Sequence, residues 1–163
     1  MDYLIFSDSH GRRNALLDVV QRQIQPPAAV FFAGDGLRDL EVLEGYDLTV
    51  HAVAGNCDWM ALEEQERLIL AGGLRVLLTH GHLYSVKSGY GRLIARGASL
   101  GADVILFGHT HQPHYERLEA GTELGTCVLA KPLHLFNPGS VAEGSFGTLT
   151  VQNGQVLLSH GRI

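Results

Sequence analysis

The chain has 163 residues, of which 45% are hydrophobic and 18% charged, and its formal net charge is −5. This length suits one domain, expected over residues 1–163, that buries its core without disulfides. The acidic balance disfavours a surface built for non-specific binding to nucleic acid, which needs clustered Lys and Arg. No apolar run approaches the roughly 20 residues of a membrane helix, so we expect a soluble protein without membrane partners.

The amino-terminal segment and the cysteine content both bear on the cellular compartment. Residues 1–7 contain neither a basic start nor a long apolar run, unlike a secretory signal. Cys57 and Cys127 are the only cysteines, too few for a disulfide framework. We therefore expect a cytoplasmic protein, with Cys127 as a small residue of the core.

Strands and helices alternate in the first third of the chain. The predicted strands are short apolar runs that end in turn residues, at 3–7, 28–33 and 49–54. Leu16, Val20 and Ile24 recur at helical spacing, and Pro26-Pro27 would stop that helix. A short helix is expected over 37–43. Such alternation is typical of a mostly parallel sheet.

The rest of the chain contains more hairpins. The runs 67–71 and 74–79 flank Gly72-Gly73, which indicates an antiparallel hairpin. A helix over 90–100 and a strand over 103–107 should follow. The last third contains short strands separated by turn residues, with Asn153-Gly154 as a hairpin turn; these strands are 115–118, 126–130, 133–136, 147–152 and 155–159.

Metal-ligating residue types recur at or just after the ends of the predicted strands. They are Asp8, His10, Asp35, Asn56, His80, His109 and His111. An open α/β sheet displays its chemistry at the carboxyl ends of its strands. Carboxylate, imidazole and amide oxygen donors suit a divalent transition metal, and Asp35 with one water could bridge two ions. The set therefore indicates a two-metal hydrolytic site for phosphoryl chemistry.

Each motif alone also fits an ordinary turn. Asp8-x-His10, Gly34-Asp35-Gly36 and Gly55-Asn56-Cys57-Asp58 all have turn-forming compositions. The pairs His80-Gly81-His82 and His109-Thr110-His111 are more specific, because alternate residues of an extended segment point the same way. Their joint occurrence at successive strand ends favours the metal site.

Other residues with possible chemistry have simpler interpretations. Four histidines lack a partner motif and are expected on the surface or satisfied in the core: His51, His114, His134 and His160. Trp59 could wall a substrate pocket, but packing is the favoured interpretation.

Six motifs in this order resemble the calcineurin-like metallophosphoesterase superfamily, and within it the small bacterial and archaeal phosphodiesterases. They are Asp8-Ser9-His10, Gly34-Asp35, Gly55-Asn56-Cys57-Asp58, Thr79-His80-Gly81-His82, Gly108-His109-Thr110-His111 and Asn137-Pro138-Gly139-Ser140. The resemblance implies an α/β fold, a four-layer α/β/β/α sandwich with two mixed β-sheets packed face to face and flanking helices. It also implies a dinuclear metal-dependent phosphoric ester hydrolase, more a phosphodiesterase than a monoesterase, acting on a small phosphate ester.

The resemblance further implies roles for individual residues. One ion would be held by Asp8, His10, Asp35 and His111, and the other by Asp35, Asn56, His80 and His109. Mn²⁺ is favoured, with Fe, Ni and Zn as alternatives. A hydroxide bridging the ions would attack phosphorus. Asn56, Asp58 and His82 are the expected catalytic residues, and the turn 137–140 should support the site from behind.

Cys57 departs from the pattern of many superfamily members, which carry His there and use it with the following acid to protonate the leaving oxygen. A thiol is a poor substitute. We therefore hypothesise that leaving-group protonation is weak or comes from His82, which favours esters with acidic leaving groups.

Two other functions would also account for parts of this sequence. A non-catalytic interaction scaffold is one, because the eukaryotic retromer subunit resembles this branch; that subunit lacks some ligands, whereas this chain keeps all of them, His10 included. A structural zinc site is disfavoured because such sites are usually closed and rich in thiolates. The expected partner is the substrate, and a homo-oligomer stays open.

Overall fold

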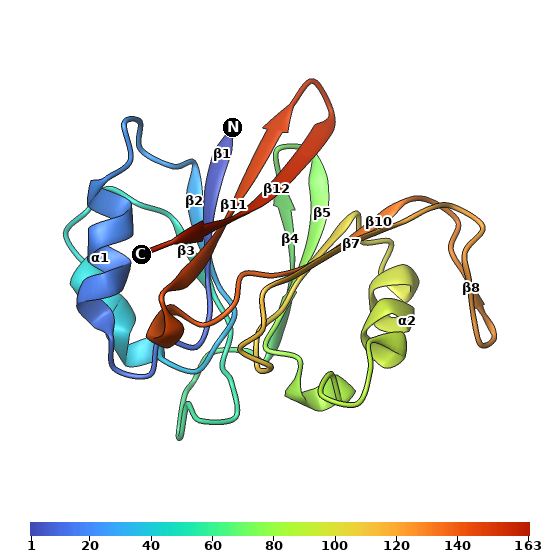
Figure 1. The fold of residues 1–163 in the computed structure, drawn as a ribbon, viewed down its shortest axis with the longest axis horizontal. Helices are drawn as coiled ribbons and strands as arrows, with labels where there is room; N and C mark the ends of the chain where they lie inside the picture. Colours follow the sequence, from blue (N-terminus) through green and yellow to red (C-terminus); the bar gives the residue numbers. More distant parts are fainter.

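Two five-stranded β-sheets lie face to face in the computed structural model, which describes residues 1–163 (Figure 1). The first sheet has the order β12-β11-β1-β2-β3, in which β1, β2 and β3 run parallel and β11 is antiparallel to both of its neighbours. Its strands are β1 (Asp2–Phe6), β2 (Ala29–Phe32), β3 (Val50–Ala52), β11 (Ser145–Gln152) and β12 (Gln155–Arg162).

The second sheet has the order β4-β5-β6-β10-β7, with parallel β5, β6 and β10 between antiparallel edge strands. Its strands are β4 (Glu66–Ala71), β5 (Leu74–Thr79), β6 (Val104–Leu106), β7 (His114–Leu118) and β10 (Leu133–Asn137). A separate two-stranded ribbon projects at the right of Figure 1 and consists of β8 (Glu123–Leu124) and β9 (Cys127–Val128).

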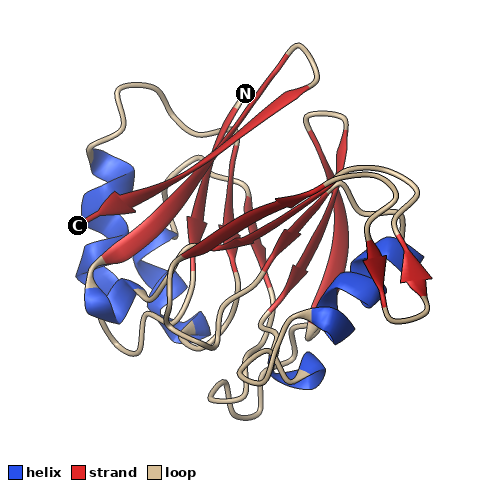
Figure 2. Ribbon diagram, turned by 45° about the vertical axis from the view of Figure 1, so that its right-hand side comes forward, coloured by secondary structure: helices blue, strands red, loops and turns tan.

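Helices cover the outer faces of both sheets, as Figure 2 shows in blue. The first sheet carries α1 (Arg13–Gln21) and the 3₁₀ helix η1 (Leu37–Leu43), and the second carries α2 (Gly91–Ser99). Two further 3₁₀ helices are η2 (His82–Tyr84) and η3 (Val141–Glu143). The predicted four-layer α/β/β/α architecture is confirmed.

The layers follow from the two-residue period of the strands. In β1, Tyr3 and Ile5 point into the core between the sheets, whereas Leu4 and Phe6 point outward. The outward side chains pack with Leu16 of α1. In the second sheet the outward-facing side chains pack against α2 in the same way. Full burial of one such side chain contributes about 1.5–3 kcal/mol, so both faces of each sheet stabilise the fold.

Several expectations about single elements need correction. Helix α1 ends at Gln21, and Ile24, expected on its apolar face, is 97% exposed. The expected stop at Pro26-Pro27 is therefore not what ends the helix, because Pro26 disfavours helical conformation only at Gln25, the residue before it. Trp59, expected to pack, is 84% exposed. The predicted strand 126–130 is limited to β9, while the half-buried Cys127 lies against the core beside α2.

The predicted hairpins are confirmed. Strands β4 and β5 join through Gly72 and Gly73, and β11 and β12 join through Asn153 and Gly154. All four of these residues have positive φ, which two-residue hairpin turns require. No helix has both the length and the apolar character needed to cross a membrane.

Candidate metal centre

The loops that follow β1, β2, β5 and β6 meet at one end of the two sheets, the lower end in Figure 1. These loops carry six of the seven predicted metal ligands, which form two groups. Within each group the ligand atoms lie within 4.8 Å of one another; the groups are Asp8, His10 and His111, and Asp35, His80 and His109. Both groups combine residues from the two sheets.

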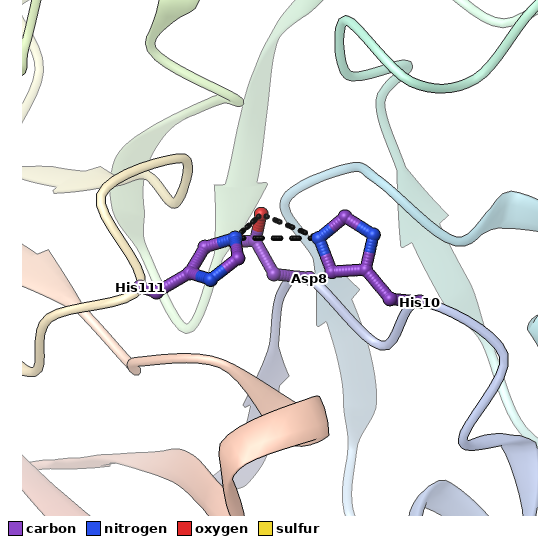
Figure 3. Close-up of side chains that lie close together, drawn as sticks. All are labelled: Asp8, His10 and His111. Atoms are coloured by element: carbon purple, nitrogen blue, oxygen red, sulfur yellow. Dashed lines mark hydrogen bonds and ion pairs between the residues drawn. The ribbon is translucent and has the colours of Figure 1, made fainter.

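The first group points three ligand atoms at one another (Figure 3). Asp8 Oδ1 lies 3.1 Å from His111 Nε2 and 3.6 Å from His10 Nε2, and the two imidazole nitrogens are 3.3 Å apart. Asp8 is buried, whereas the two rings are partly open to solvent. The carboxylate therefore forms the buried floor of the group, and the side with the two rings is accessible to solvent.

The second group lies deeper and adjoins the first. His80 Nε2 is 3.2 Å from Asp35 Oδ2 and 3.2 Å from His109 Nδ1. The same nitrogen is 3.9 Å from Asp8 Oδ1, so the two groups are neighbours. His80 Nδ1 donates to the carbonyl of Ala33 at 2.7 Å, which leaves Nε2 unprotonated in the neutral ring and directs its lone pair to the centre.

One buried carboxylate oxygen, Asp8 Oδ1, indicates that cations fit this arrangement. Asp8 Oδ2 accepts hydrogen bonds from the Ser7 hydroxyl and the His109 N–H, but Asp8 Oδ1 has no hydrogen-bond partner. A buried acceptor left without a partner costs about 1–3 kcal/mol, more when it is charged. A cation beside Oδ1 would remove that cost, and the surrounding imidazole nitrogens are suitable co-ligands. The residues present therefore fit divalent metal ions.

The backbone conformation at the centre is unusual. Of the eight non-glycine residues with positive φ, five are predicted metal ligands: Asp8, His10, Asp35, His109 and His111. Each such residue costs of order 1–3 kcal/mol in backbone strain, and such strain clusters at functional sites. Gly55 allows the close approach of two of these loops, because a Cβ there would overlap Asp35 Oδ1.

Charge favours the metal-binding protonation states of Asp35 and His109 but opposes that of His80. Burial alone would raise the pKa of Asp35, but the hydrogen bond and charge of His80, with the Cys57 N–H, hold it well below its usual range. Burial also opposes the charged form of His80, yet Asp35 and Asp8 raise its pKa. Burial and the charge of His80 lower the pKa of His109 to about 4, so this ring is neutral at pH 7.

The three predicted catalytic residues lie near the centre in different settings. Asn56 is exposed on the loop after β3, and its amide contacts Cys57 Sγ at 3.5 Å. His82, on η2, has its ring centroid 5.4 Å from that of His80 and 6.1 Å from that of His109. His82 Nδ1 is buried without a hydrogen-bond partner, and burial, with the charge of His80, lowers the pKa of this ring.

The carboxylate of Asp58 accepts four backbone hydrogen bonds. The donors are the N–H groups of Asp35 at 2.7 Å, Gly36 at 2.9 Å, Leu37 at 3.0 Å and Gly55 at 2.8 Å. These contacts make Asp58 a positioning group for the loops after β2 and β3. Its role in proton transfer stays a prediction. Burial and the nearby Asp35 raise the pKa of the Cys57 thiol, which keeps it protonated.

A surrounding set of residues holds the ligands in place. Asn137 Nδ2 donates to the Gly108 carbonyl and to Thr110 Oγ1, both at 3.0 Å, and Ser140 Oγ donates to the Asp8 carbonyl at 2.8 Å. The turn 137–140 therefore lies behind the centre. Sequence reasoning missed Glu143, whose Oε1 is 3.5 Å from His111 Nδ1; its position three residues after the Ser140 motif was the available indication.

The four remaining histidines pack on aromatic rings away from the centre. His51 stacks on Phe31 and His160 stacks on Phe136, while His114 contacts Tyr90 and His134 stacks on Tyr115. None belongs to a metal-ligating group. The expectation that they are surface or satisfied core residues is confirmed.

Comparison with known proteins agrees with this geometry. Residues 1–161 match the calcineurin-like phosphoesterase superfamily domain. The Bacillus subtilis (strain 168) protein named "Probable metallophosphoesterase YsnB" is 36% identical over an alignment of 163 residues. This alignment covers 94% of this chain and 86% of that protein.

Two solved structures share the fold. A predicted phosphoesterase from Streptococcus pneumoniae TIGR4 has a TM-score of 0.77 at 23% identity and covers 99% of this chain and 88% of its own. Zinc-complexed Vps29 from Entamoeba histolytica has a TM-score of 0.74 at 21% identity, with 99% of both chains covered. Because the family model spans almost the whole sequence, the chain belongs to the calcineurin-like phosphoesterase superfamily.

Proposed function

We propose that this chain is a dinuclear metal-dependent phosphoesterase, and specifically a phosphodiesterase that hydrolyses a small phosphate ester. The observation that carries the proposal is the buried, unpartnered Asp8 Oδ1 with imidazole nitrogens of His10, His80 and His111 within 3.9 Å. Without a cation, this buried oxygen lowers the stability of the fold, because it has lost water and gained no partner. Carboxylate and imidazole together are suitable ligands for a divalent cation.

The two groups of side chains supply most of the coordination that two ions need. Asp8, His10 and His111 would hold one ion and His80 and His109 the other, with Asp35 shared and Asn56 adding an amide oxygen to the second. When bound, two divalent ions, with Mn²⁺ favoured over Fe, Ni and Zn, polarise a phosphoryl oxygen and make water acidic enough to ionise near neutral pH.

The protein's own groups orient the ligands and handle the proton. Ala33 and Glu143 fix the rings of His80 and His111 through their Nδ1 atoms. His82 is the proposed proton donor to the leaving oxygen, because its Nδ1 is buried, lacks a partner and lies beside the centre. Because the pKa of His82 is lowered, only a small fraction of this ring carries the extra proton at pH 7. Esters with acidic leaving groups, which need less protonation, should therefore react best.

The charge of the centre supports a diester substrate. The side chains that form the two groups are carboxylates and imidazoles, and Lys87 adds one positive charge nearby, which helps to lower the pKa of His109. A phosphodiester carries one negative charge, whereas a monoester carries up to two and needs more compensating positive charge. The resemblance to small phosphodiesterases points the same way.

The test is a substrate panel on metal-free protein reloaded with Mn²⁺, Fe²⁺, Ni²⁺ or Zn²⁺. Bis(p-nitrophenyl) phosphate, p-nitrophenyl phosphate and cyclic nucleotides would be compared, with metal content measured in parallel. We expect two ions per chain and faster diester hydrolysis, and we expect Asp35→Asn to reduce the rate at least about a hundredfold, since one lost electrostatic contact costs that much. His134→Gln, away from the centre, is the control. Unchanged metal-stimulated hydrolysis in Asp35→Asn would refute the assigned site.

A scaffold function is the second candidate, favoured by the fold shared with Vps29. It predicts that the chain binds fewer than two equivalents of Mn²⁺ or Zn²⁺ and hydrolyses none of the panel. The complete set of ligands supports the enzyme instead.

A further inference from the structure

The loop from Ala54 to Glu64 connects the metal centre to an apolar tip. Its ends are joined, because the Ala54 N–H donates to the Glu64 carbonyl at 2.9 Å. The Cys57 N–H donates to Asp35 Oδ1 at 2.8 Å, and Asp58 accepts three backbone N–H groups from the loop after β2 and one from Gly55 of its own loop. The base of the loop is therefore fixed to the ligand Asp35, as in compact loops whose ends meet.

The tip of this loop exposes three large apolar side chains. Trp59 is 84% exposed, and Met60 and Leu62 are each 99% exposed. Met60 has a φ of 57°, a left-handed conformation that bulky residues rarely adopt. Single apolar residues on a surface are ordinary, but three within four successive positions on a strained loop indicate a contact surface. In Figure 1 the loop projects at the bottom of the view, at the end where the metal centre lies.

We propose that Trp59 is a specificity-determining residue that stacks on a planar aromatic group carried by the phosphate ester at the metal centre. This inference rests on the proposed phosphoesterase function. An indole offers a flat π-face to another ring, and the neighbouring Met60 thioether also makes favourable contacts with aromatic edges. The substrate class is then an aryl or nucleoside phosphate ester.

The chemistry of the centre is consistent with an aromatic leaving group. Cys57 takes the position where many superfamily members carry His, and a thiol is a poor substitute for an imidazole as proton donor. A phenolic oxygen is a weaker base than an alkoxide, so it departs with less help from a proton donor. Of the two ester classes that Trp59 would recognise by their ring, this argument favours the aryl esters.

Charge on the loop disfavours the alternative of a membrane contact. Residues 56–66 contain no Lys or Arg, and Glu63 and Glu64 are exposed directly after the apolar tip. An anionic lipid surface attracts basic segments and repels acidic ones. A small aromatic ligand fits this apolar, uncharged tip better.

The first experiment uses the intrinsic fluorescence of Trp59, which is the only tryptophan in the chain. Metal-loaded protein would be titrated with two matched pairs of ligands: phenylphosphonate against methylphosphonate, and AMP against ribose 5-phosphate. Each pair differs by an aromatic ring, and the pairs separate the aryl source from the nucleoside source. We expect the aromatic member of at least one pair to quench Trp59 and to bind about tenfold more tightly, as ring stacking on a protein aromatic residue commonly provides.

The second experiment compares variants by calorimetry and by kcat/KM for aryl and alkyl phosphodiesters. Trp59→Ala should lose the preference for aromatic ligands about tenfold, mainly through KM, and Trp59→Phe should retain most of it. Ile24→Ala, which removes another exposed apolar side chain from the loop after α1, should behave like the unmodified protein.

The outcomes separate this proposal from the proposed function. Equal affinity within both ligand pairs, with an unchanged preference in Trp59→Ala, would overturn the role of Trp59 while hydrolysis persists. Absence of all hydrolysis would instead contradict the enzyme, and the fluorescence titration would still support the aromatic contact. A response of Trp59 to lipid vesicles of phosphatidylcholine or phosphatidylserine, without a response to any aromatic ligand, would overturn the proposal in favour of a membrane contact.

Discussion

The contacts of Asp58 support a positioning role, and its predicted role in proton transfer stays a prediction. The sequence suggested a proton donor, whereas its carboxylate accepts four backbone N–H groups that fix the loops around Asp35. Asn at this position keeps one acceptor oxygen and turns an NH₂ group toward N–H donors. We expect Asp58→Asn to lower the free energy of unfolding of metal-free protein by about 2–4 kcal/mol, because hydrogen bonds to charged groups each contribute about 1.5–3 kcal/mol.

Urea unfolding of metal-free protein measures this effect, with Asp47→Asn, an exposed acidic residue, as the control. Rates on aryl esters of graded leaving-group pKa separate the two roles. A positioning role predicts a similar loss for every ester. Unchanged stability, with a loss confined to esters of basic leaving groups, would restore the proton donor.

The sequence predicted which side chains gather at the centre, but not how each is held. Asp8 and Asp35 could be brought together in advance because the carboxyl ends of the neighbouring parallel strands β1 and β2 meet at one edge, whereas His80 follows β5 of the other sheet. The contact of His111 with Glu143 and the unpartnered oxygen of Asp8 could not, because both depend on side-chain orientation across segments more than thirty residues apart.

At the level of elements, local turn chemistry was more informative than apolar spacing. Gly72-Gly73 and Asn153-Gly154 specified hairpins because their positive φ values are accessible to few other residues. Ile24 continued an apolar period beyond the end of α1, and Trp59 suggested packing that does not occur. Periodicity alone does not report whether a neighbouring element is present to cover a side chain.

The contact between α2 and β6 depends on Gly97. A Cβ at this position would overlap Ile105 Cδ1 and lie 2.9 Å from Ile105 Cγ1. Gly97→Ala improves helix propensity by about 1 kcal/mol, but overpacking typically costs about 1–3 kcal/mol. We therefore expect Gly97→Ala to destabilise the protein or leave it no more stable, in contrast to Gly91→Ala at the start of α2, where no atom lies within 4 Å of the added Cβ.

A double-mutant cycle tests the cause. Ile105→Val removes the overlapping Cδ1 atom, so the pair Gly97→Ala and Ile105→Val should cost less than the sum of the single changes, as measured by urea unfolding. Additive costs would show that the close approach of α2 to β6 is not the origin of the effect.

For the molecule as a whole, the candidate metal centre joins two sheets whose facing sides pack mainly through apolar side chains. Asp8 and His10 follow β1 and Asp35 follows β2 in the first sheet, whereas His80 follows β5 and His109 and His111 follow β6 in the second. Each candidate group takes ligands from both sheets. Bound ions would therefore connect the sheets at one end of the sandwich.

Metal removal should accordingly lower the stability of the entire fold. A ligand present at a hundred times its Kd stabilises the native state by about 2.7 kcal/mol per site, so two ions should add about 5 kcal/mol to the free energy of unfolding. His111→Ala, which removes the only second-sheet ligand of the first group, should retain about half of this gain, and His134→Ala all of it. Urea unfolding with and without Mn²⁺ measures these differences.

Hydrogen exchange shows where in the fold the ions act. Metal binding should slow amide exchange in the loops after β1 and β2 and also in the loops after β5 and β6. Protection confined to the loops of one sheet would contradict a centre that joins both.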